Sequence, residues 1–409
     1  MAKPTIRFKG YTDDWEQRKL GDLVDRVTRK NQDLVSELPL TISAQYGLID
    51  QNEFFDKRVA SKDVSGYYLI ENGEFAYNKS TSTDAPWGAI KRLDRYENGV
   101  LSTLYIVFGI KANNPIDSDF LVSYYSTNLW HKGIHEIAAE GARNHGLLNI
   151  APADFFETKL MIPQDIEEQK KIGKYFEELE RLITLHQRKC EETKILKKYM
   201  LQKMFPQNGQ KVPEIRFKGF TDDWEQRKLG DVLERRIEQR QQSEEYPRLA
   251  FASGQGVIPL SERKTNNREQ LTKDEYTKKY LVTELNDIVY NPANVKYGAI
   301  DRNKCGRGLI SPIYVTFTTN EIPGFIERIV TSHDFQQRAL RFEEGTVTKR
   351  QSVNPEDLVT LDILVAPKRE EQQKIATYFD SLDHLITLHQ RKCEELQNIK
   401  KFMLQNMFV

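Results

Sequence analysis

The amino-acid sequence predicts a mixed α/β protein with two pseudo-symmetric α/β domains, joined by two long helices that form an antiparallel coiled coil. Two duplications support this prediction. Residues 4–22 return almost unchanged as residues 213–231, and residues 167–205 return as residues 370–408. The sequences between these blocks have diverged widely. The chain therefore consists of two units of about 200 residues, each bounded by the same two duplicated blocks. Between these blocks each unit has a different segment, called its insert, which is residues 23–166 in the first unit and 232–369 in the second.

The duplicated blocks also set the expected domain boundaries. The first block of each unit opens an α/β domain, and the second block is a long helix that follows it. The expected segments are residues 1–166 for the first domain, 167–205 for the first helix, 206–212 for a linker, 213–369 for the second domain and 370–409 for the second helix.

The two inserts share a faint skeleton, which predicts one fold for both. Ser102 and Tyr105 match Ser311 and Tyr314 at an offset of 209 positions. Alternating apolar residues between Gly and Pro turns predict strands, and longer apolar patterns predict helices after them. The expected strands cover residues 74–77, 104–108, 287–290 and 313–317, and the expected helices lie around residues 120–139 and 325–343.

The long repeated block has the apolar spacing of a coiled-coil helix. Apolar and semi-apolar residues recur at steps of three and four, with charged residues between them and no internal proline. Neither helix can bury its stripe alone. If the two units are related by a two-fold axis, the helices pair in opposite directions. The expected core of the pair is Ile172, Phe176, Leu179, Ile183, His186, Cys190, Ile375, Phe379, Leu382, Ile386, His389 and Cys393.

The composition indicates a cytoplasmic protein. The three cysteines do not form a disulfide framework, and we find neither a membrane-spanning apolar run nor a secretion signal. The chain has 60 basic and 60 acidic residues. Any surface for nucleic acid must therefore be local.

The sequence offers no catalytic residues and no bound metal that we would assign. It lacks a G-x-x-x-x-G-K-[ST] phosphate loop, and Asn291-Pro292-Ala293-Asn294 lacks the second proline and the aromatic of an amino-methyltransferase motif. His186 and Cys190, with His389 and Cys393, could suggest a zinc site. An antiparallel pair would hold the sulfurs roughly 12 Å apart, so a polar layer that fixes the register is the preferred interpretation.

At the level of the whole chain, the sequence resembles the DNA-specificity subunit of type I restriction-modification systems. The resemblance rests on the repeated PxIRFKGFxDDWEQRKLGD opening, the Tyr-Asn and Gly-Ala-Ile elements of the inserts, and the EEQxKI start of each helix. It implies two target recognition domains that read the halves of a bipartite, asymmetric double-stranded DNA sequence. The helices would set the half-site spacing and dock two methyltransferase subunits, which methylate adenine N6. Restriction subunits would cleave unmodified DNA. S-adenosylmethionine, ATP and Mg would belong to these partners, and this chain would be non-catalytic, without a cofactor of its own.

Residues for DNA contact are expected in turn-like segments that differ between the inserts. Arginine and lysine can contact guanine and phosphates, and asparagine and glutamine can pair with adenine. Each of these residues alone could equally be a solvated loop residue. The candidates are Gln45, Tyr46, Asn78, Lys79, Lys91, Arg92, Arg143, Asn144 and His145 in the first insert, and Gln255, Asn291, Asn294, Lys296, Arg302, Lys304, Arg307, Lys349, Arg350 and Gln351 in the second.

Two other function classes remain open at this point. A stand-alone DNA-modifying enzyme with its own specificity module would methylate or cleave DNA by itself. A coiled-coil scaffold that binds only protein would leave the divergence of the inserts without a reason.

Overall fold

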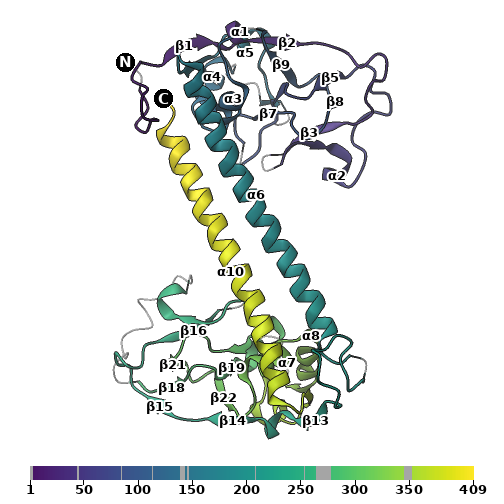
Figure 1. Ribbon diagram of the computed structural model, residues 1–409, viewed down its shortest axis with the longest axis vertical. Helices are drawn as coiled ribbons and strands as arrows, with labels where there is room; N and C mark the ends of the chain where they lie inside the picture. Colours follow the sequence, from purple (N-terminus) through teal and green to yellow (C-terminus); the bar gives the residue numbers. More distant parts are fainter. Residues whose placement is uncertain are drawn as a thin grey trace. The chain divides into compact units, whose positions relative to one another are not determined.

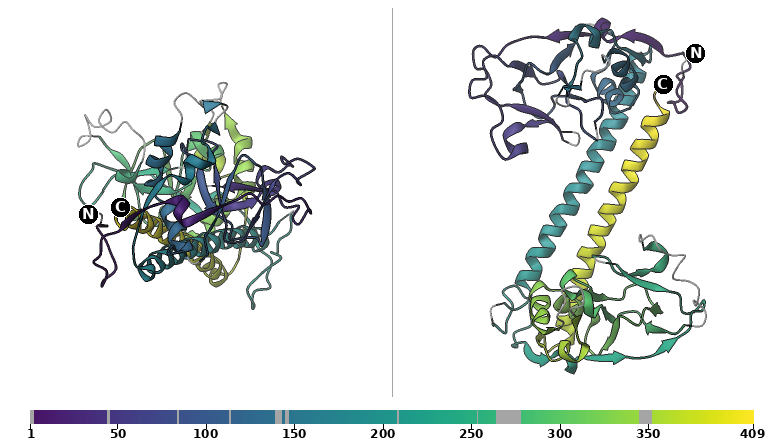
Figure 2. Two further views of the ribbon diagram at one scale, coloured as in Figure 1. Left: turned by 90° about the horizontal axis from the view of Figure 1, so that it is seen from above. Right: turned by 180° about the vertical axis from the view of Figure 1, so that it is seen from behind.

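The computed structural model describes residues 3–43, 46–83, 85–112, 114–138, 143–144, 147–207, 209–252, 254–263, 278–344 and 352–409. The chain forms two compact units (Figures 1 and 2). Unit 1 comprises Met1–Gln187 together with Gln390–Val409, and unit 2 comprises Arg188–His389. Each unit thus contains one insert and a part of each long helix.

A four-stranded antiparallel sheet forms the centre of each insert, and the two sheets have the same strand order. This agreement confirms that the inserts share one fold. Buried aromatic residues on the second and third strands, such as Phe75 and Phe108 in unit 1, stack face to face. The sheet of unit 1 is β2 (Val24–Val27), β9 (Ile106–Ile110), β6 (Phe75–Asn78) and β7 (Ala89–Arg92), and that of unit 2 is β14 (Leu233–Arg236), β22 (Val315–Thr319), β19 (Ile288–Tyr290) and β20 (Ile300–Arg302).

Smaller antiparallel sheets surround each central sheet and also correspond between the units. In unit 1 the pairs are β1 (Glu16–Lys19) with β12 (Lys159–Ile162), β3 (Leu40–Ser43) with β4 (Gly47–Asp50), β5 (Tyr68–Glu71) with β8 (Asn98–Leu101), and β10 (Arg143–Asn144) with β11 (Leu147–Leu148). In unit 2 they are β13 (Glu225–Lys228) with β25 (Asp362–Val365), β16 (Leu249–Ala252) with β17 (Gly256–Pro259), β23 (Glu343–Glu344) with β24 (Ser352–Val353), and β15 (Gln239–Arg240) with β18 (Tyr280–Thr283) and β21 (Gly308–Ile310).

Short helices follow the sheet in each insert. The sequence predicted one helix around residues 120–139 and one around 325–343, but the structure divides each into two. The breaks occur at hydroxyl residues that bond to the backbone, as where Ser332 accepts a hydrogen bond from the Phe335 N–H at 3.2 Å. The helices are α1 (Leu20–Leu23), α2 (Gln51–Phe55), α3 (Ser118–Tyr125), α4 (Trp130–Ile137) and α5 (Pro152–Phe156) in unit 1, and η1 (Leu229–Asp231), η2 (Leu260–Glu262), η4 (Pro292–Tyr297), α7 (Pro323–Val330), α8 (His333–Ala339), η5 (Leu340–Phe342) and α9 (Pro355–Leu358) in unit 2.

The two long helices are α6 (Ile166–Lys203) and α10 (Arg369–Asn406), each with 38 residues. Within unit 1, Phe176 packs on Phe408, and Glu180 pairs with Lys400. Because the residue numbers rise on α6 while they fall on α10, the segments run antiparallel. Unit 2 repeats this arrangement, and the predicted antiparallel direction is confirmed. None of the helices in the described parts of the chain is long and apolar enough to cross a membrane.

The repeated sequence motifs anchor each long helix to its domain. In unit 1 the Arg7 guanidinium donates two hydrogen bonds to the buried Glu168 carboxylate, at 2.6 and 2.8 Å. Arg216 and Glu371 form the same pair at the same distances in unit 2. These bidentate pairs explain why the opening segment and the EEQ start of the helix are both duplicated.

The chain termini meet in unit 1. The backbone N–H of Ile6 donates to the Asn406 carbonyl at 2.9 Å, and Phe408 packs among Trp15, Phe120 and Phe176. In unit 2 the same places are filled by one continuous stretch of chain. There Ile215 donates to the Lys203 carbonyl, also at 2.9 Å, and Phe205 packs among Trp224, Phe325 and Phe379.

Candidate nucleic-acid interface

In unit 1, candidate DNA-contacting residues gather at the end of strand β6. Pairing of Tyr77 with Ile106 places Asn78 beside Tyr105, and the Asn78 amide donates to the Tyr105 hydroxyl at 3.3 Å. The next residue, Lys79, accepts a backbone hydrogen bond from Leu148 of β11 at 3.0 Å. The structure thus brings Asn78 and Lys79 next to the hairpin of β10 and β11, which carries Arg143 and Asn144.

Burial shifts the pKa values of Lys79 and Tyr77 at this strand end. Burial, and secondarily the positive charge of Arg26, lowers the pKa of the Lys79 ammonium. A phosphate would relieve both effects, because an opposite charge favours the protonated form. Tyr77 is different, since its hydroxyl donates to the Trp87 carbonyl at 2.8 Å and burial raises its pKa. Tyr77 is therefore a core residue that fixes the position of Asn78.

Unit 2 repeats this arrangement with different side chains. Asn291 follows β19 and caps helix η4, where its side-chain oxygen accepts from the Ala293 N–H at 3.1 Å. Tyr290 donates to the Val353 carbonyl of β24 at 3.2 Å, and so holds the hairpin of β23 and β24 beside Asn291. Both units therefore join an Asn-containing strand end to a short hairpin. The candidates Lys349, Arg350 and Gln351 belong to the segment between β23 and β24 and lie outside the described residues.

The remaining turn candidates are placed as follows. Tyr46 and Gln255 are exposed in the turns of the matching hairpins β3–β4 and β16–β17. Asn294 is half-buried within η4. Arg307 is exposed, but its guanidinium binds Glu284 and Glu245 at 2.9 and 2.6 Å. Gln45 and His145 lie outside the described residues, and of Arg143, Asn144 and Lys296 only the backbone is described.

Lys91 and Arg92 lie on β7, and the Arg92 side chain reaches helix α3. The Arg92 guanidinium binds Asp94 at 2.6 Å and Asp119 of α3 at 2.7 Å. Burial lowers the pKa of Lys91, and the neighbouring charge of Lys400 on α10 lowers it further. Lys91 lies opposite Ala76 on β6 and is therefore a diagonal neighbour of Asn78, whereas Arg92 lies opposite Phe75.

Arg302 and Lys304 belong to a charged network that holds β20 against α7 and α10. Glu327, which is only 2% exposed, accepts hydrogen bonds from Arg302 and Lys304, both at 2.6 Å. Arg302 also binds Asp380 of α10 at 2.8 Å. Carboxylates already enclose the Arg302 guanidinium, which disfavours the DNA contact predicted from the sequence. We therefore leave Arg302 and Lys304 out of the proposed interface.

Sequence reasoning did not include Tyr105 and Tyr314 among the functional residues. Both lie beside the asparagine at the strand end, and both occur at the same offset in otherwise divergent inserts. This repetition in the sequence could have indicated that the two tyrosines have a common role.

The expected seam of the helix pair is largely buried. Ile172, Phe176, Leu179, Ile183 and Cys190 of α6, and Ile375, Phe379 and Leu382 of α10, are each at most 7% exposed, whereas His186, Ile386, His389 and Cys393 are half-buried. The Cys190 thiol lies 4.0 Å from the Ile386 carbonyl. In the parts of the chain that the structure describes, no three His, Cys, Asp or Glu side chains are grouped to hold a metal ion.

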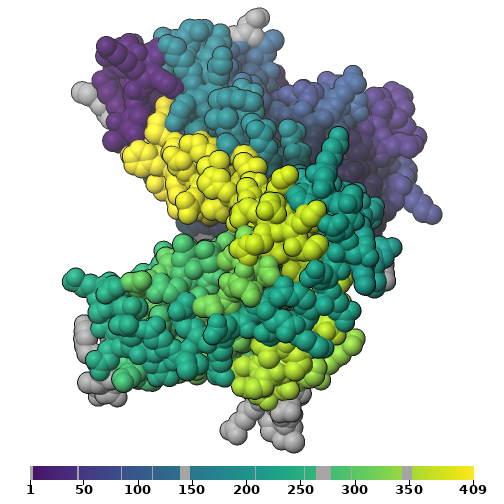
Figure 3. Space-filling view, turned by 60° about the horizontal axis from the view of Figure 1, so that its bottom comes forward, coloured from purple at the N-terminus to yellow at the C-terminus, as the bar shows by residue number. Residues whose placement is uncertain are grey.

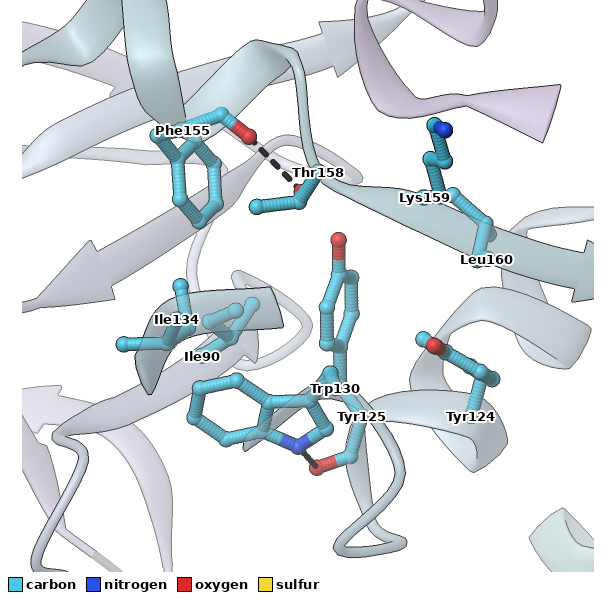
Figure 4. Close-up of a pocket in the computed structure, with 9 residues that line it drawn as sticks. All are labelled: Ile90, Tyr124, Tyr125, Trp130, Ile134, Phe155, Thr158, Lys159 and Leu160. Carbon is cyan, nitrogen blue, oxygen red and sulfur yellow. Dashed lines mark hydrogen bonds between the residues drawn. The ribbon is translucent and has the colours of Figure 1, made fainter. Parts of the chain in front are cut away.

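A small cavity in unit 1 lies between α3, α4, α5 and β12 (Figure 4). It has room for about 10 Å³ of solvent, so it is far too small for a nucleotide or a methyl donor. Trp130 donates to the Tyr125 carbonyl at 3.2 Å, and Thr158 donates to the Phe155 carbonyl at 2.7 Å. The cavity is a packing gap of the core.

Comparison with known proteins agrees with this architecture. Residues 12–194 match the family model of the type I restriction modification DNA specificity domain. A protein of Methanocaldococcus jannaschii, named as a candidate specificity subunit of the type I restriction enzyme MjaX, is 21% identical over 95% of this chain and 91% of its own length. The crystal structure of a type I restriction-modification system S subunit from M. genitalium has a TM-score of 0.63 at 12% identity, and the match covers 100% of this chain and 99% of that chain.

Proposed function

We propose, on the premise that residues 12–194 form a type I restriction modification DNA specificity domain, that this chain selects the DNA target of a type I restriction-modification complex. Each unit reads one half of a bipartite, asymmetric sequence, and the paired long helices set the distance between the halves. Two methyltransferase subunits that use S-adenosylmethionine methylate adenine N6. ATP- and Mg-dependent restriction subunits cleave DNA that lacks the modification.

The observation that carries this proposal is one scaffold with two different sets of turn residues. The strand ends at Asn78 and Asn291, and the hairpins beside them, occupy matching places in the two units. Around them the side chains differ, as with Lys79 in unit 1 and Pro292 in unit 2. The common scaffold positions the turns, and the side chains of the turns determine which bases are recognised. Bases are recognised by side chains that reach their edges in the grooves of DNA.

A second observation supports two identical partners. Leu196 and Tyr199 of α6 are 44% and 48% exposed, and their repeat equivalents Ile399 and Phe402 of α10 are 37% and 55% exposed. Each pair is spaced i, i+3 and so forms one apolar patch on its helix. The part of α10 that carries the second patch lies at the surface of unit 1 (Figure 3). Two equal patches suit two copies of one methyltransferase.

The division of labour rests on the sequence motifs. The whole sequence contains no P-loop, and Asn291-Pro292-Ala293-Asn294, its nearest match to an amino-methyltransferase motif, lacks the residues that would grip a flipped base. We therefore assign methylation and ATP hydrolysis to the partner subunits.

The test is to purify the complex through an affinity tag on this chain and to map methylated adenines in the genome of the source cells. We expect one bipartite motif, which is lost when the gene is deleted. Exchange of residues 232–369 for another such insert should change one half of the motif and leave the other half. Adenine methylation by the purified chain alone would overturn the proposal.

The apolar patches give a sharper prediction about assembly. Tyr199→Glu or Phe402→Glu should each remove one methyltransferase subunit from the complex, because a buried aromatic at an interface commonly contributes about 2 kcal/mol or more. Native mass spectrometry would count the subunits. The matched control is Ile237→Glu, since Ile237 is 75% exposed outside the long helices and its repeat equivalent is the polar Thr28. A full complement of subunits in both patch variants would contradict this docking site.

A further inference from the structure

One turn of each insert presents an aliphatic side chain to solvent. Leu104 lies in the turn between β8 and β9 and is 54% exposed, and Ile313 lies in the turn between β21 and β22 and is 63% exposed. The two residues are equivalent at the offset of 209 positions. Single exposed aliphatic residues are common on protein surfaces, so exposure alone carries little weight.

The duplication distinguishes this pair from the other exposed apolar residues. In the described parts of the two inserts, other large exposed apolar side chains, such as Phe54, Leu129 and Leu285, have no exposed apolar counterpart at the matching position. Leu104 and Ile313 have kept this character although the inserts around them have diverged. A demand common to both units therefore acts at this position.

The two turns also have the same conformation and the same neighbours. The Tyr105 N–H donates to the Ser102 carbonyl at 3.0 Å, and the Tyr314 N–H donates to the Ser311 carbonyl at the same distance. In each unit the tyrosine packs inward. It lies beside Asn78 in unit 1 and beside Asn291 in unit 2, as the strand register shows. Leu104 and Ile313 each directly precede this tyrosine in the chain. They therefore lie close to the strand end that we propose as part of the DNA interface.

We infer that Leu104 and Ile313 press against the base pairs of the two half-sites as sequence-independent apolar wedges. This inference rests on the proposed function. Leucine and isoleucine are among the residues that proteins insert between base steps, where they partly unstack the duplex. A contact that reads a thymine methyl would depend on the base at that place, so two different half-sites would give no reason to keep it. Leu104 and Ile313 share only an aliphatic side chain. Such a side chain can pack against stacked base pairs whatever their sequence.

The experiment uses the complex purified through a tag on this chain and a duplex that carries its methylation motif. Two versions of the duplex carry 2-aminopurine, one in each half-site, and the emission of this base analogue rises when it unstacks. Leu104→Ala and Ile313→Ala are compared with Leu129→Ala and Leu285→Ala, which truncate exposed leucines without a repeat counterpart. Subunit stoichiometry is measured for every variant, and the methylated motif is mapped again.

We expect Leu104→Ala to weaken DNA binding about ten-fold, since most of a buried leucine side chain is lost, and Ile313→Ala to do the same. Each variant should abolish the 2-aminopurine signal in one half-site only, with an unchanged motif and full subunit stoichiometry, while the controls behave as wild type. Unchanged affinity would overturn the inference. Loss of a subunit would instead assign the residue to a protein interface, and a changed base preference would assign it to base reading. Failure of the wild-type complex to bind the duplex would refute the proposed function itself.

Discussion

At the scale of single residues, equivalent positions carry opposite charges. Lys91 on β7 corresponds to Asp301 on β20, and both are largely enclosed. Burial lowers the pKa of Lys91, whereas burial, and after it the charge of Glu327, raises the pKa of Asp301. In both cases folding disfavours the charged form of the side chain. The presence of a charged residue at this position therefore does not stabilise the isolated domain.

Asp301→Asn should therefore stabilise the protein at neutral pH. The folded-state pKa of Asp301 lies above its unfolded value, so the penalty on folding grows as the pH rises from the unfolded-state pKa to the folded-state pKa and is complete above it. The penalty disappears where the carboxyl is protonated in both states. We expect a rise in melting temperature of roughly 2 °C at pH 7.5 that vanishes in acid. Calorimetry across the pH range measures it.

The control for this prediction is Asp362→Asn. A hydrogen bond from Lys228 lowers the pKa of Asp362, so folding favours its charge. That variant should not be stabilised at any pH. A melting temperature of Asp301→Asn at or below that of the wild type at pH 7.5 would contradict the account.

The residue scale is also where the sequence predicted least. Arg302 was predicted as a DNA contact because it is a basic residue in a segment that differs between the inserts, but its partners Glu327 and Asp380 lie 25 and 78 positions away. No local pattern reveals such a network. The Tyr-Asn pair that both inserts repeat singled out Asn78 and Asn291, whose contact with DNA stays a prediction.

At the scale of elements, the long helices were predicted to within a few residues. The sequence predicted residues 167–205 and 370–409, and the structure gives Ile166–Lys203 and Arg369–Asn406. Ten turns of consistent periodicity leave little ambiguity. The helices of the inserts were predicted less well because one hydrogen bond, as at Ser332, ends a helix that the apolar pattern would continue.

The length of these helices leads to a prediction about the target. One heptad added to both helices at the same layer would lengthen each by ~10.5 Å, which corresponds to about three base pairs at ~3.4 Å each. The non-specific spacer of the methylation motif should grow by that amount, with both half-sites unchanged. Mapping of methylated adenines measures the spacer, and an unchanged spacer would show that the helices do not set it. Insertion of a heptad into α6 alone serves as the control, and it should abolish activity because the seam falls out of register.

At the scale of the whole molecule, unit 1 is completed by a part of the chain that is distant in sequence, whereas unit 2 is one continuous segment. Phe408 belongs to the core of unit 1, together with Trp15 and Phe120. Phe205 fills the same place in unit 2 beside Trp224. The antiparallel pairing was predictable from the connectivity, but this exchange of helix ends between the two cores was not predicted from the repeats.

Phe408→Ala should destabilise unit 1 by about 3 kcal/mol, because it leaves a cavity among buried aromatic rings. Hydrogen exchange followed by mass spectrometry should show lost protection around Trp15 and Phe120, with unit 2 unaffected. Phe402→Ala is the control in the isolated chain, since that ring is 55% exposed. Equal loss of protection in both units would contradict the assignment of Phe408 to unit 1 alone.

The meeting of the two chain ends in unit 1 has a consequence for biosynthesis. The ribosome makes residues 1–187 first, yet the aromatic pocket around Trp15 stays open until the last residues emerge. The domain that is translated first therefore keeps part of its apolar core exposed to solvent during synthesis. The core of unit 2 can form with Phe205 as soon as the start of α10 has been translated. A premature stop codon before residue 408 would remove Phe408 from the core of the first-made domain, so truncated products should be recognised by chaperones and proteases through that domain.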